Sequence, residues 1–272
     1  MESAAAMELK LYDFAESVCC QKIRLVVAEK GIAFREMPVP LDQGAQYEPA
    51  FLKLNPKGIV PVAVHGDNVI TESTIINEYL EEVFDGPNLL PDDPYGRARS
   101  RYWSLQVDQG IHSPHTTLVS FVIALRYAFL QKLDTPEKIA GHLENVRDPV
   151  SREMQRQGFE LAYDAPAFRA GIRAFDTLLK EMNDALAETP WLAGNEPSLG
   201  DFNLAPYVHR LECLGLSGMW KNHEHLSRWY EDLKQRPSWS TAIQKPHLEK
   251  WLELMEMGGK EGWPHVKKLL LR

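Results

Sequence analysis

The sequence predicts two domains, an α/β domain at the amino-terminal end and a larger all-α domain after it. Short strand-like runs alternate with helical periods over the first 85 residues, and no later segment alternates strictly between apolar and polar residues. Between them, residues 85–94 hold three prolines, a glycine and three aspartates, a composition typical of a linker. We therefore predict domains at 1–85 and 95–272 joined by a linker at 86–94.

The first domain has the expected order β-α-β-α-β-β-α. Gly31 is predicted to end the first helix, and Asn55-Pro56 followed by Lys57-Gly58 is a turn signal that ends the second. The turn formers His65-Gly66-Asp67 predict a hairpin between the last two strands. The expected strands are 9–12, 34–39, 60–64 and 68–71, and the expected helices are 18–30, 47–54 and 75–83.

The second domain is expected to be helical because its apolar residues recur at helical spacing. The 272 residues are ample for a sizeable apolar core in two domains. The tail at 245–272 has a mixed pattern that favours neither a helix nor a strand. The expected helical windows are 95–111, 118–132, 168–186, 202–214 and 226–233.

Composition excludes several classes of function. The net charge of −8 argues against a nucleic-acid partner, since phosphates require a basic surface. Three cysteines, two of them adjacent, cannot form a disulfide framework, which favours a reducing compartment. The most apolar run, 118–125, falls short of the roughly 20 residues of a membrane span. We expect a soluble cytoplasmic protein without a membrane or nucleic-acid partner.

A proline stands where the third strand should begin. Proline cannot donate a ladder hydrogen bond, so Pro61 suits an edge, a strand start or a cis peptide. If Val60-Pro61 is cis, the backbone N–H and C=O of Val60 face solvent and can pair with an extended peptide. An ordinary turn is the alternative.

Residues 71–74 mark the junction between the fourth strand and the third helix. The hydroxyl of Ser73 and the free N–H groups of a helix start can bind a carboxylate, while the neighbouring Glu72 can pair with an ammonium group. Together they match the two charged ends of an amino acid. In the alternative interpretation, Ser73 only caps the helix and Glu72 decorates its first turn.

The junction between the first strand and the first helix carries Ser17-Val18-Cys19-Cys20. A thiol at a helix N-terminus has its pKa lowered by the positive end of the helix dipole. Ser17 could donate a hydrogen bond to a bound thiolate, and Cys19 could itself be a nucleophile. The alternative is a Ser17 cap followed by cysteines that act as small buried hydrophobes.

No metal site is predicted. His223-Glu224-His225 places its histidines at i and i+2, which point to different faces of a helix, and no third ligand pattern accompanies them. We expect a solvated turn there.

The three junction motifs share the order and register of glutathione transferases, and the chain resembles that superfamily over nearly its whole length. Residues 55–62 followed by 70–73 resemble the family's glutathione-site signature, and residues 197–202 resemble its second-domain capping motif. The resemblance implies a thioredoxin-like first domain. It also implies a structural cap in which Ser198 is the N-cap and Asp201 its reciprocal partner.

The resemblance further implies roles for individual residues. Glu72 and Ser73 would hold the γ-glutamyl end of glutathione, and Lys57 would be a counter-charge for one of its carboxylates. Val60 would pair with the cysteinyl backbone, and Pro61 would be cis.

Ser17 occupies the position at which serine-type members stabilise the thiolate. A thiol pKa lowered from about 8.5 by about two units would stabilise the thiolate by ~2.7 kcal/mol. Glutathione is therefore the expected co-substrate.

Within the superfamily, residues 69–84 with Arg97, Trp103 and Asp108 look most like bacterial glutathione-dependent β-aryl etherases. Residues 163–191 and the Ser17-Val18-Cys19 arrangement are also similar to reductive dehalogenases of chlorinated hydroquinones. In those enzymes a cysteine at the position of Cys19 takes the substrate adduct. The Cys19-Cys20 pair departs from the etherase pattern and keeps a cysteine mechanism open.

We therefore expect a glutathione transferase that attacks a small hydrophobic aromatic electrophile, with β-aryl ether cleavage as the preferred reaction. Reductive dehalogenation or thiol exchange through Cys19 is the first alternative, and a non-catalytic glutathione-binding protein is the second. The resemblance also implies a homodimer. Aromatic and apolar walls with a few polar anchors suit such a substrate, and the candidate pocket residues are Phe14, His112, His115, Phe121 and Tyr127.

Overall fold

The computed structural model describes residues 7–146 and 148–271, which form two compact units. Unit 1 comprises the described residues of Met1–Ser104, Thr189–Pro206 and Glu231–Leu248. Unit 2 comprises the described residues of Leu105–Glu188, Tyr207–Tyr230 and Glu249–Arg272. Each unit is therefore assembled from segments that are distant in the sequence.

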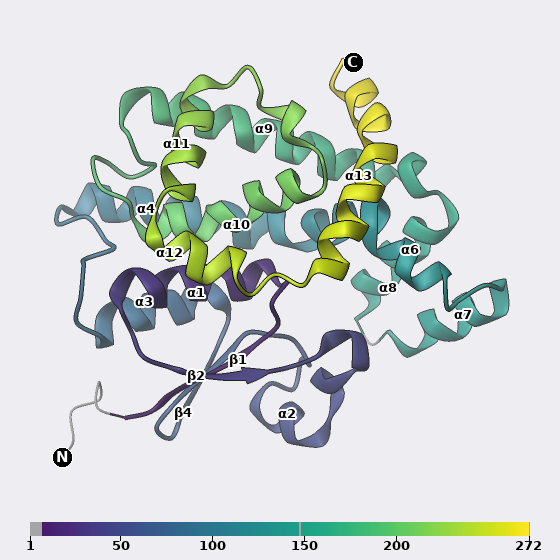
Figure 1. The fold of residues 1–272 in the computed structure, drawn as a ribbon, viewed down its shortest axis with the longest axis horizontal. Helices are drawn as coiled ribbons and strands as arrows, with labels where there is room; N and C mark the ends of the chain where they lie inside the picture. Colours follow the sequence, from purple (N-terminus) through teal and green to yellow (C-terminus); the bar gives the residue numbers. More distant parts are fainter. Residues whose placement is uncertain (1–6, 147, 272) are drawn as a thin grey trace. The chain divides into compact units, whose positions relative to one another are not determined.

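Unit 1 begins with the predicted order of strands and helices, which is confirmed (Figure 1). Gly31 ends the first helix with a left-handed φ of 66°, as its position in the sequence predicts. The elements are β1 (Leu9–Asp13), α1 (Val18–Lys30), β2 (Arg35–Pro38), α2 (Pro49–Leu54), β3 (Val62–His65), β4 (Asn68–Thr71) and α3 (Ser73–Val83). Two short 3₁₀ turns, η2 (Leu41–Gln43) and η3 (Ala45–Tyr47), connect β2 to α2.

The four strands form a mixed sheet in the order β2-β1-β3-β4. Strand β1 is parallel to β2 and antiparallel to β3, and β3 is antiparallel to β4. One row across the sheet aligns Tyr12 with Val62 and Val62 with Thr71. Because of this row, the segments that follow β1, precede β3 and follow β4 leave the sheet at the same end.

The later segments of unit 1 pack on this first part. Helix α4 (Pro94–Gln106) carries the buried Trp103, whose indole N–H donates to the carbonyl of Leu192 at 3.1 Å. Residues 84–93, all of them described, contain no helix or strand. The domain boundary predicted there stays a prediction, while compact unit 1 continues to Ser104.

The predicted cap at the start of α10 (Leu199–Cys213) is a buried cluster. The backbone N–H and the hydroxyl of Ser198 both donate to Oδ2 of Asp201 at 2.9 Å. Oδ1 of Asp201 accepts from the backbone N–H of Leu192 at 3.0 Å. The hydrogen bond from the Ser198 N–H to the Asp201 side chain is the one that the capping motif predicts. The motif also expects the Ser198 hydroxyl to accept from a backbone N–H, but here the hydroxyl donates to the carboxylate.

Unit 2 is built of helices, with a break at Gly110 and Ser113, whose backbone angles are not helical. The long helix α9 (Pro166–Glu188) buries one face that includes Phe168, Phe175 and Leu179. Its other elements are η4 (Val107–Thr116), α5 (Thr117–Ser120), η5 (Phe121–Leu125), α6 (Arg126–Leu130), α7 (Pro136–Asn145), α8 (Pro149–Glu160), η6 (Ala162–Asp164), η7 (Ser217–Met219) and α13 (Glu249–Leu270). Helix α11 (Glu224–Lys234) leads back into unit 1, which also contains α12 (Pro237–Trp239) and η8 (Ser240–Gln244).

Candidate functional site

The register of the sheet gathers the three junction motifs at one end of unit 1. Tyr12, Val62 and Thr71 lie in one row across β1, β3 and β4. From this row the chain leaves the sheet on the same side three times, after β1, before β3 and after β4. The Ser17 loop, the Val60-Pro61 peptide and the Glu72-Ser73 junction are therefore neighbours, as the sequence motifs predict for a single site.

The loop between β1 and α1 is closed by its own hydrogen bonds. The backbone N–H of Ser17 donates to the carbonyl of Phe14 at 2.9 Å, and Ser17 Oγ accepts from the backbone N–H of Cys20 at 3.4 Å. Ser17 is thus the N-cap of α1, which agrees with the alternative interpretation of this motif as a helix cap. A hydroxyl also carries one proton to donate, so the cap leaves Ser17 able to donate toward a bound sulfur.

The adjacent cysteines occupy different environments. Cys20 is fully buried in an apolar cluster with Val39, Phe51 and Val62. Burial, aided by the nearby carboxylate of Asp13, raises the pKa of the Cys20 thiol well above its usual value, so this thiol stays protonated. Cys19 is half-buried on the first turn of α1, where the helix dipole favours a thiolate. Of these two thiols, that of Cys19 is the more accessible.

The peptide between Val60 and Pro61 is cis, as the glutathione-site resemblance implies. Val60 lies before β3, which begins at Val62. Asn55 shapes the turn that leads to it, since its side-chain amide donates to the carbonyl of Ile59 at 2.8 Å and accepts from the N–H of Lys57 at 3.1 Å. Asn55 was predicted only as a turn former, and its role in the site comes from these contacts.

Glu72 is the N-cap of α3 in an uncommon backbone conformation. Its φ of 67° lies in the left-handed region, which costs a residue with a Cβ atom about 1–3 kcal/mol. Ser73 is the first residue of α3 and is buried. The strained backbone turns the chain sharply from β4 into α3, and it places the helix start at the edge of the site.

Lys57 and Glu72, both assigned to glutathione by the family resemblance, form an ion pair with each other. The ammonium group of Lys57 lies 2.7 Å from Oε1 of Glu72, with 68% and 55% of the two side chains exposed. The hydrogen bond to Glu72 raises the pKa of Lys57 above its ordinary value. Exposed pairs of this kind contribute little to stability, so a charged ligand can exchange with either partner.

A buried lysine joins the two helix starts. Lys22 of α1 is fully buried, and its ammonium group donates to the hydroxyl of Thr74 on the first turn of α3 at 2.6 Å. Sequence periodicity gave no sign of this contact, because a lysine in a helix is ordinarily assigned to the solvent face. The contact fixes the spacing between the Ser17 motif and the Ser73 motif.

The five predicted pocket residues fall into both units. Phe14 is half-buried and packs against the Cys20 cluster in unit 1. In unit 2, the His112 ring packs edge-on against Tyr207 with centroids 6.0 Å apart. Phe121 is buried among Phe129 and Phe159, which are the contacts of a core side chain.

The other two pocket candidates are polar groups held in their neutral forms. Burial lowers the pKa of His115, whose Nδ1 is buried with no hydrogen-bond partner among the described residues. The Tyr127 hydroxyl accepts from Arg126 at 2.9 Å and lies 3.3 Å from the Tyr163 hydroxyl. Burial, followed by a hydrogen bond to Glu261, raises the pKa of Tyr127 far above its usual value. A contribution of these residues to substrate binding stays a prediction.

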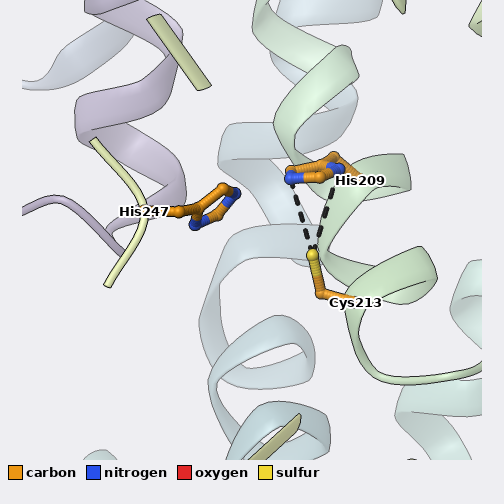
Figure 2. Close-up of side chains that lie close together, drawn as sticks. All are labelled: His209, Cys213 and His247. Carbon is orange, nitrogen blue, oxygen red and sulfur yellow. Dashed lines mark hydrogen bonds between the residues drawn. The ribbon is translucent and has the colours of Figure 1, made fainter. Parts of the chain in front are cut away.

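A further cluster in unit 2 was not singled out by the sequence. Cys213 Sγ lies 3.5 Å from Nε2 and 4.0 Å from Nδ1 of His209 (Figure 2). The Tyr230 hydroxyl lies 2.9 Å from Nδ1 of His209 and donates to Glu212 at 2.6 Å. The Cys213 thiol therefore contacts a histidine whose other ring nitrogen is already engaged by Tyr230.

Two family models match the chain, and both agree with the architecture. The model of the glutathione S-transferase N-terminal domain matches residues 7–82, and that of the C-terminal domain matches residues 165–232. Glutathione S-transferase 1 of Dianthus caryophyllus is 45% identical over 208 residues, which is 76% of this chain and 79% of that protein. The fold is thus a thioredoxin-like domain followed by a helical domain, and the chain belongs to the glutathione S-transferase family.

Two bacterial relatives cover most of the chain. Protein LigF of Sphingobium sp. strain SYK-6 is 28% identical over 256 residues, which is 91% of this chain and 97% of LigF. The crystal structure of the beta-etherase LigF superposes with a TM-score of 0.76 at 26% identity and covers 88% of this chain and 100% of that one. The tetrachloro-p-hydroquinone reductive dehalogenase of Sphingobium chlorophenolicum is 26% identical over 243 residues, 88% of this chain and 97% of the relative.

No helix formed by the described residues is long and apolar enough to cross a membrane.

Proposed function

We propose that this glutathione transferase activates the thiol of glutathione at the start of α1 and uses it to cleave β-aryl ethers. The observation that carries the proposal is the register that gathers the Ser17 loop, the Val60-Pro61 peptide and the Glu72-Ser73 junction. The similarity to LigF in sequence and in structure supports the choice of an ether as the substrate. As part of the same proposal, the protein is a cytoplasmic homodimer.

Glutathione would lie along the end of the sheet in an extended form. The backbone of Val60 would pair with its cysteinyl residue in the manner of an added strand. The carboxylate of Glu72 would pair with the γ-glutamyl ammonium group, and Ser73 with the α3 N-terminus would bind the γ-glutamyl carboxylate. Lys57 would release Glu72 and turn to a glutathione carboxylate.

In the reaction, the Ser17 hydroxyl donates a hydrogen bond to the glutathione sulfur and stabilises the thiolate. The thiolate attacks the carbon that bears the aryloxy group, a carbon–sulfur bond forms, and the carbon–oxygen bond breaks. The electron pair of that bond leaves with the phenolate, which takes a proton to become a phenol. Thiolate stabilisation and the joint binding of both reactants lower the barrier.

A second candidate is favoured by the contrast between the two cysteines and by the dehalogenase relative. In this reaction, a glutathione thiolate first forms a carbon–sulfur bond with the ring as chloride leaves, and the Cys19 thiolate then attacks the sulfur of this glutathionyl-aromatic adduct. A disulfide forms between Cys19 and glutathione, the carbon–sulfur bond breaks, and the aromatic carbon takes a proton. A second glutathione then releases the first as glutathione disulfide.

The test compares Ser17→Ala with Cys19→Ala, using an aryl-ether model substrate and a chlorinated hydroquinone. We expect Ser17→Ala to lower kcat/KM for the ether by about 100-fold, the factor that corresponds to ~2.7 kcal/mol, and Cys19→Ala to change it less than about threefold. Cys213→Ala is the control for cysteine substitution outside unit 1. Unchanged ether turnover in the Ser17 variant refutes the assigned role of Ser17. A Cys19–glutathione disulfide seen by intact mass, together with loss of dehalogenation in Cys19→Ala, supports the second candidate.

A further inference from the structure

A segment near the carboxyl end of the chain lies along α1 within unit 1. Residues 236–248, here called the strap, run in the direction opposite to α1. They contact that helix near both of its ends and in its middle. From the carboxyl end of α1 to the loop before it, the hydrogen bonds join Arg236 and Ser238 to Glu29, Ala242 to Arg24, and His247 and Leu248 to Glu16.

The last of these contacts is a buried pair next to the candidate thiol site. Nδ1 of His247 lies 3.0 Å from both carboxylate oxygens of Glu16, and only 7% and 6% of the two side chains are exposed. An ionised carboxylate only accepts, so Nδ1 of His247 carries the hydrogen. The backbone N–H of Leu248 donates to Oε1 of the same carboxylate at 2.8 Å. Glu16 is thereby held by two donors from the strap.

The other side of the loop is held by Arg24, which the strap also contacts. Its guanidinium donates to Asp13 Oδ2 at 2.5 Å and to the carbonyl of Ala15 at 2.6 Å. Nε of Arg24 donates to the strap carbonyl of Ala242 at 2.8 Å. The residues before Ser17 are therefore fixed by a buried network whose anchor is the strap.

Glu16 directly precedes Ser17, so a displacement of its carboxylate moves the N-cap of α1. Displacements of the order of 1 Å at a positioned group reduce turnover by about 100-fold in enzymes. The strap lies beyond the matched family regions, which end at residue 232. The family match therefore assigns it no role.

We propose that the strap positions the thiol site, with His247 as the positioning residue that holds the loop of Ser17 and Cys19 through Glu16. The inference rests on the proposed function for the identity of the site. In this proposal, His247 acts on the site through Glu16. Loosening the strap should leave the fold intact and misplace the thiol.

The experiment compares His247→Leu, which lacks a donor, with His247→Asn, whose amide N–H can replace Nδ1. Both are made in a Cys213→Ser background. This removes the other half-buried cysteine, and because Cys20 is buried, Cys19 is then the accessible thiol. We measure the thiolate absorbance of bound glutathione, the KM for glutathione and the rate at which an aromatic disulfide modifies Cys19. Thr241→Val is the matched control, since the hydroxyl of this exposed strap residue donates to the carbonyl of Pro237 within the strap.

We expect His247→Leu to lower the thiolate absorbance and to reduce kcat/KM about tenfold, with a changed rate of Cys19 modification. His247→Asn should restore these values to within about threefold, and Thr241→Val should match the parent. Equal behaviour of the Leu and Asn variants, or a Cys19 rate and glutathione affinity unchanged in His247→Leu, overturns the inference.

The readouts also separate this inference from the proposed function. If the parent fails to cleave any aryl ether while His247→Leu still alters Cys19 reactivity, the proposed substrate is wrong and the positioning role stands. If His247→Leu does not fold, Glu16→Gln gives the second test. The glutamine keeps an acceptor for Leu248 but weakens the bond to His247, so it should shift the same readouts in the same direction. An unchanged Glu16→Gln variant overturns the inference.

Discussion

The two helix starts that flank the candidate glutathione site are held in different ways. The start of α1 is fixed by buried bonds from Arg24 and His247, whose partners are nine-tenths or more buried. Apart from its bond to the buried Lys22, the start of α3 carries a strained Glu72 whose side chain pairs with Lys57 in solvent. In the proposed reaction, a fixed geometry suits the α1 start, where bonds would be made and broken, and an adjustable ion pair suits the α3 start, which would bind charge.

Removing the buried anchor should produce the largest effect. Arg24→Leu leaves the carboxylate of Asp13 buried without its partner, so we expect the free energy of unfolding to fall by about 3–5 kcal/mol. Urea unfolding followed by circular dichroism measures it. Arg24→Lys, which keeps one charge for Asp13, should lose less. A loss below about 1 kcal/mol in Arg24→Leu would show that the α1 start is no more firmly held than the α3 start.

Relieving the strain at the α3 start should have a smaller effect of opposite sign. Glycine adopts a positive φ without a steric cost, and its unfolded-state entropy offsets part of the gain, so Glu72→Gly should stabilise the fold by about 1 kcal/mol. The KM for glutathione should rise because the carboxylate is lost. Glu72→Ala separates the two effects, since it removes the carboxylate and keeps the Cβ atom. Equal stability of the Gly and Ala variants would contradict the strain.

The exposed ion pair should contribute least. Lys57→Ala is expected to change the free energy of unfolding by less than about 0.5 kcal/mol, because solvent and salt screen this pair. Urea unfolding at low and high salt tests this, with Lys53→Ala as an exposed lysine control on α2. If Lys57→Ala lowers the free energy of unfolding by more than about 1 kcal/mol at both salt concentrations, the α3 start is held as firmly as the α1 start.

The sequence predicted those parts of the site that depend on local chemistry. The cis peptide at Pro61 was implied by the family resemblance, since the residues alone left an ordinary turn open. The cap at Ser17 and the helix start at Ser73 follow from residue types at strand and helix junctions. The order of elements in the first domain follows from periodicity and turn residues. These features need only neighbours in the sequence, so a single chain reveals them.

Helix α13 could not be predicted, because its glycines and its proline are ordinarily helix breakers. The structure gives the reason for two of the glycines. A Cβ atom at Gly258 would overlap the carbonyl oxygen of Ile123, and one at Gly259 would lie 2.5 Å from the carbonyl oxygen of Leu214. Close backbone approach within unit 2 therefore overrides the local preference, and such packing is not visible in the local pattern.

The burial of charged residues in unit 1 could not be predicted from the sequence either. Lys22, Arg24 and Glu16 are charged residues in or beside a helix whose pattern suggests solvent-facing positions. Arg24 has a nearby partner in Asp13, but its contact with the strap is 218 residues away, and the partner of Glu16 is 231 residues away. A sequence without aligned homologues offers no signal for pairings at that distance.

The discontinuous composition of unit 1 bears on how the chain folds as it is made. Its last segment ends at Leu248, so the unit cannot be completed while the ribosome is still translating the middle of the message. Until then, Arg24 lacks the carbonyl of Ala242, which accepts its hydrogen bond, and Glu29 lacks the guanidinium of Arg236, which neutralises its charge. The loop that carries Ser17 therefore gains all of its contacts only after Leu248 has been synthesised, long after the first strand and helix.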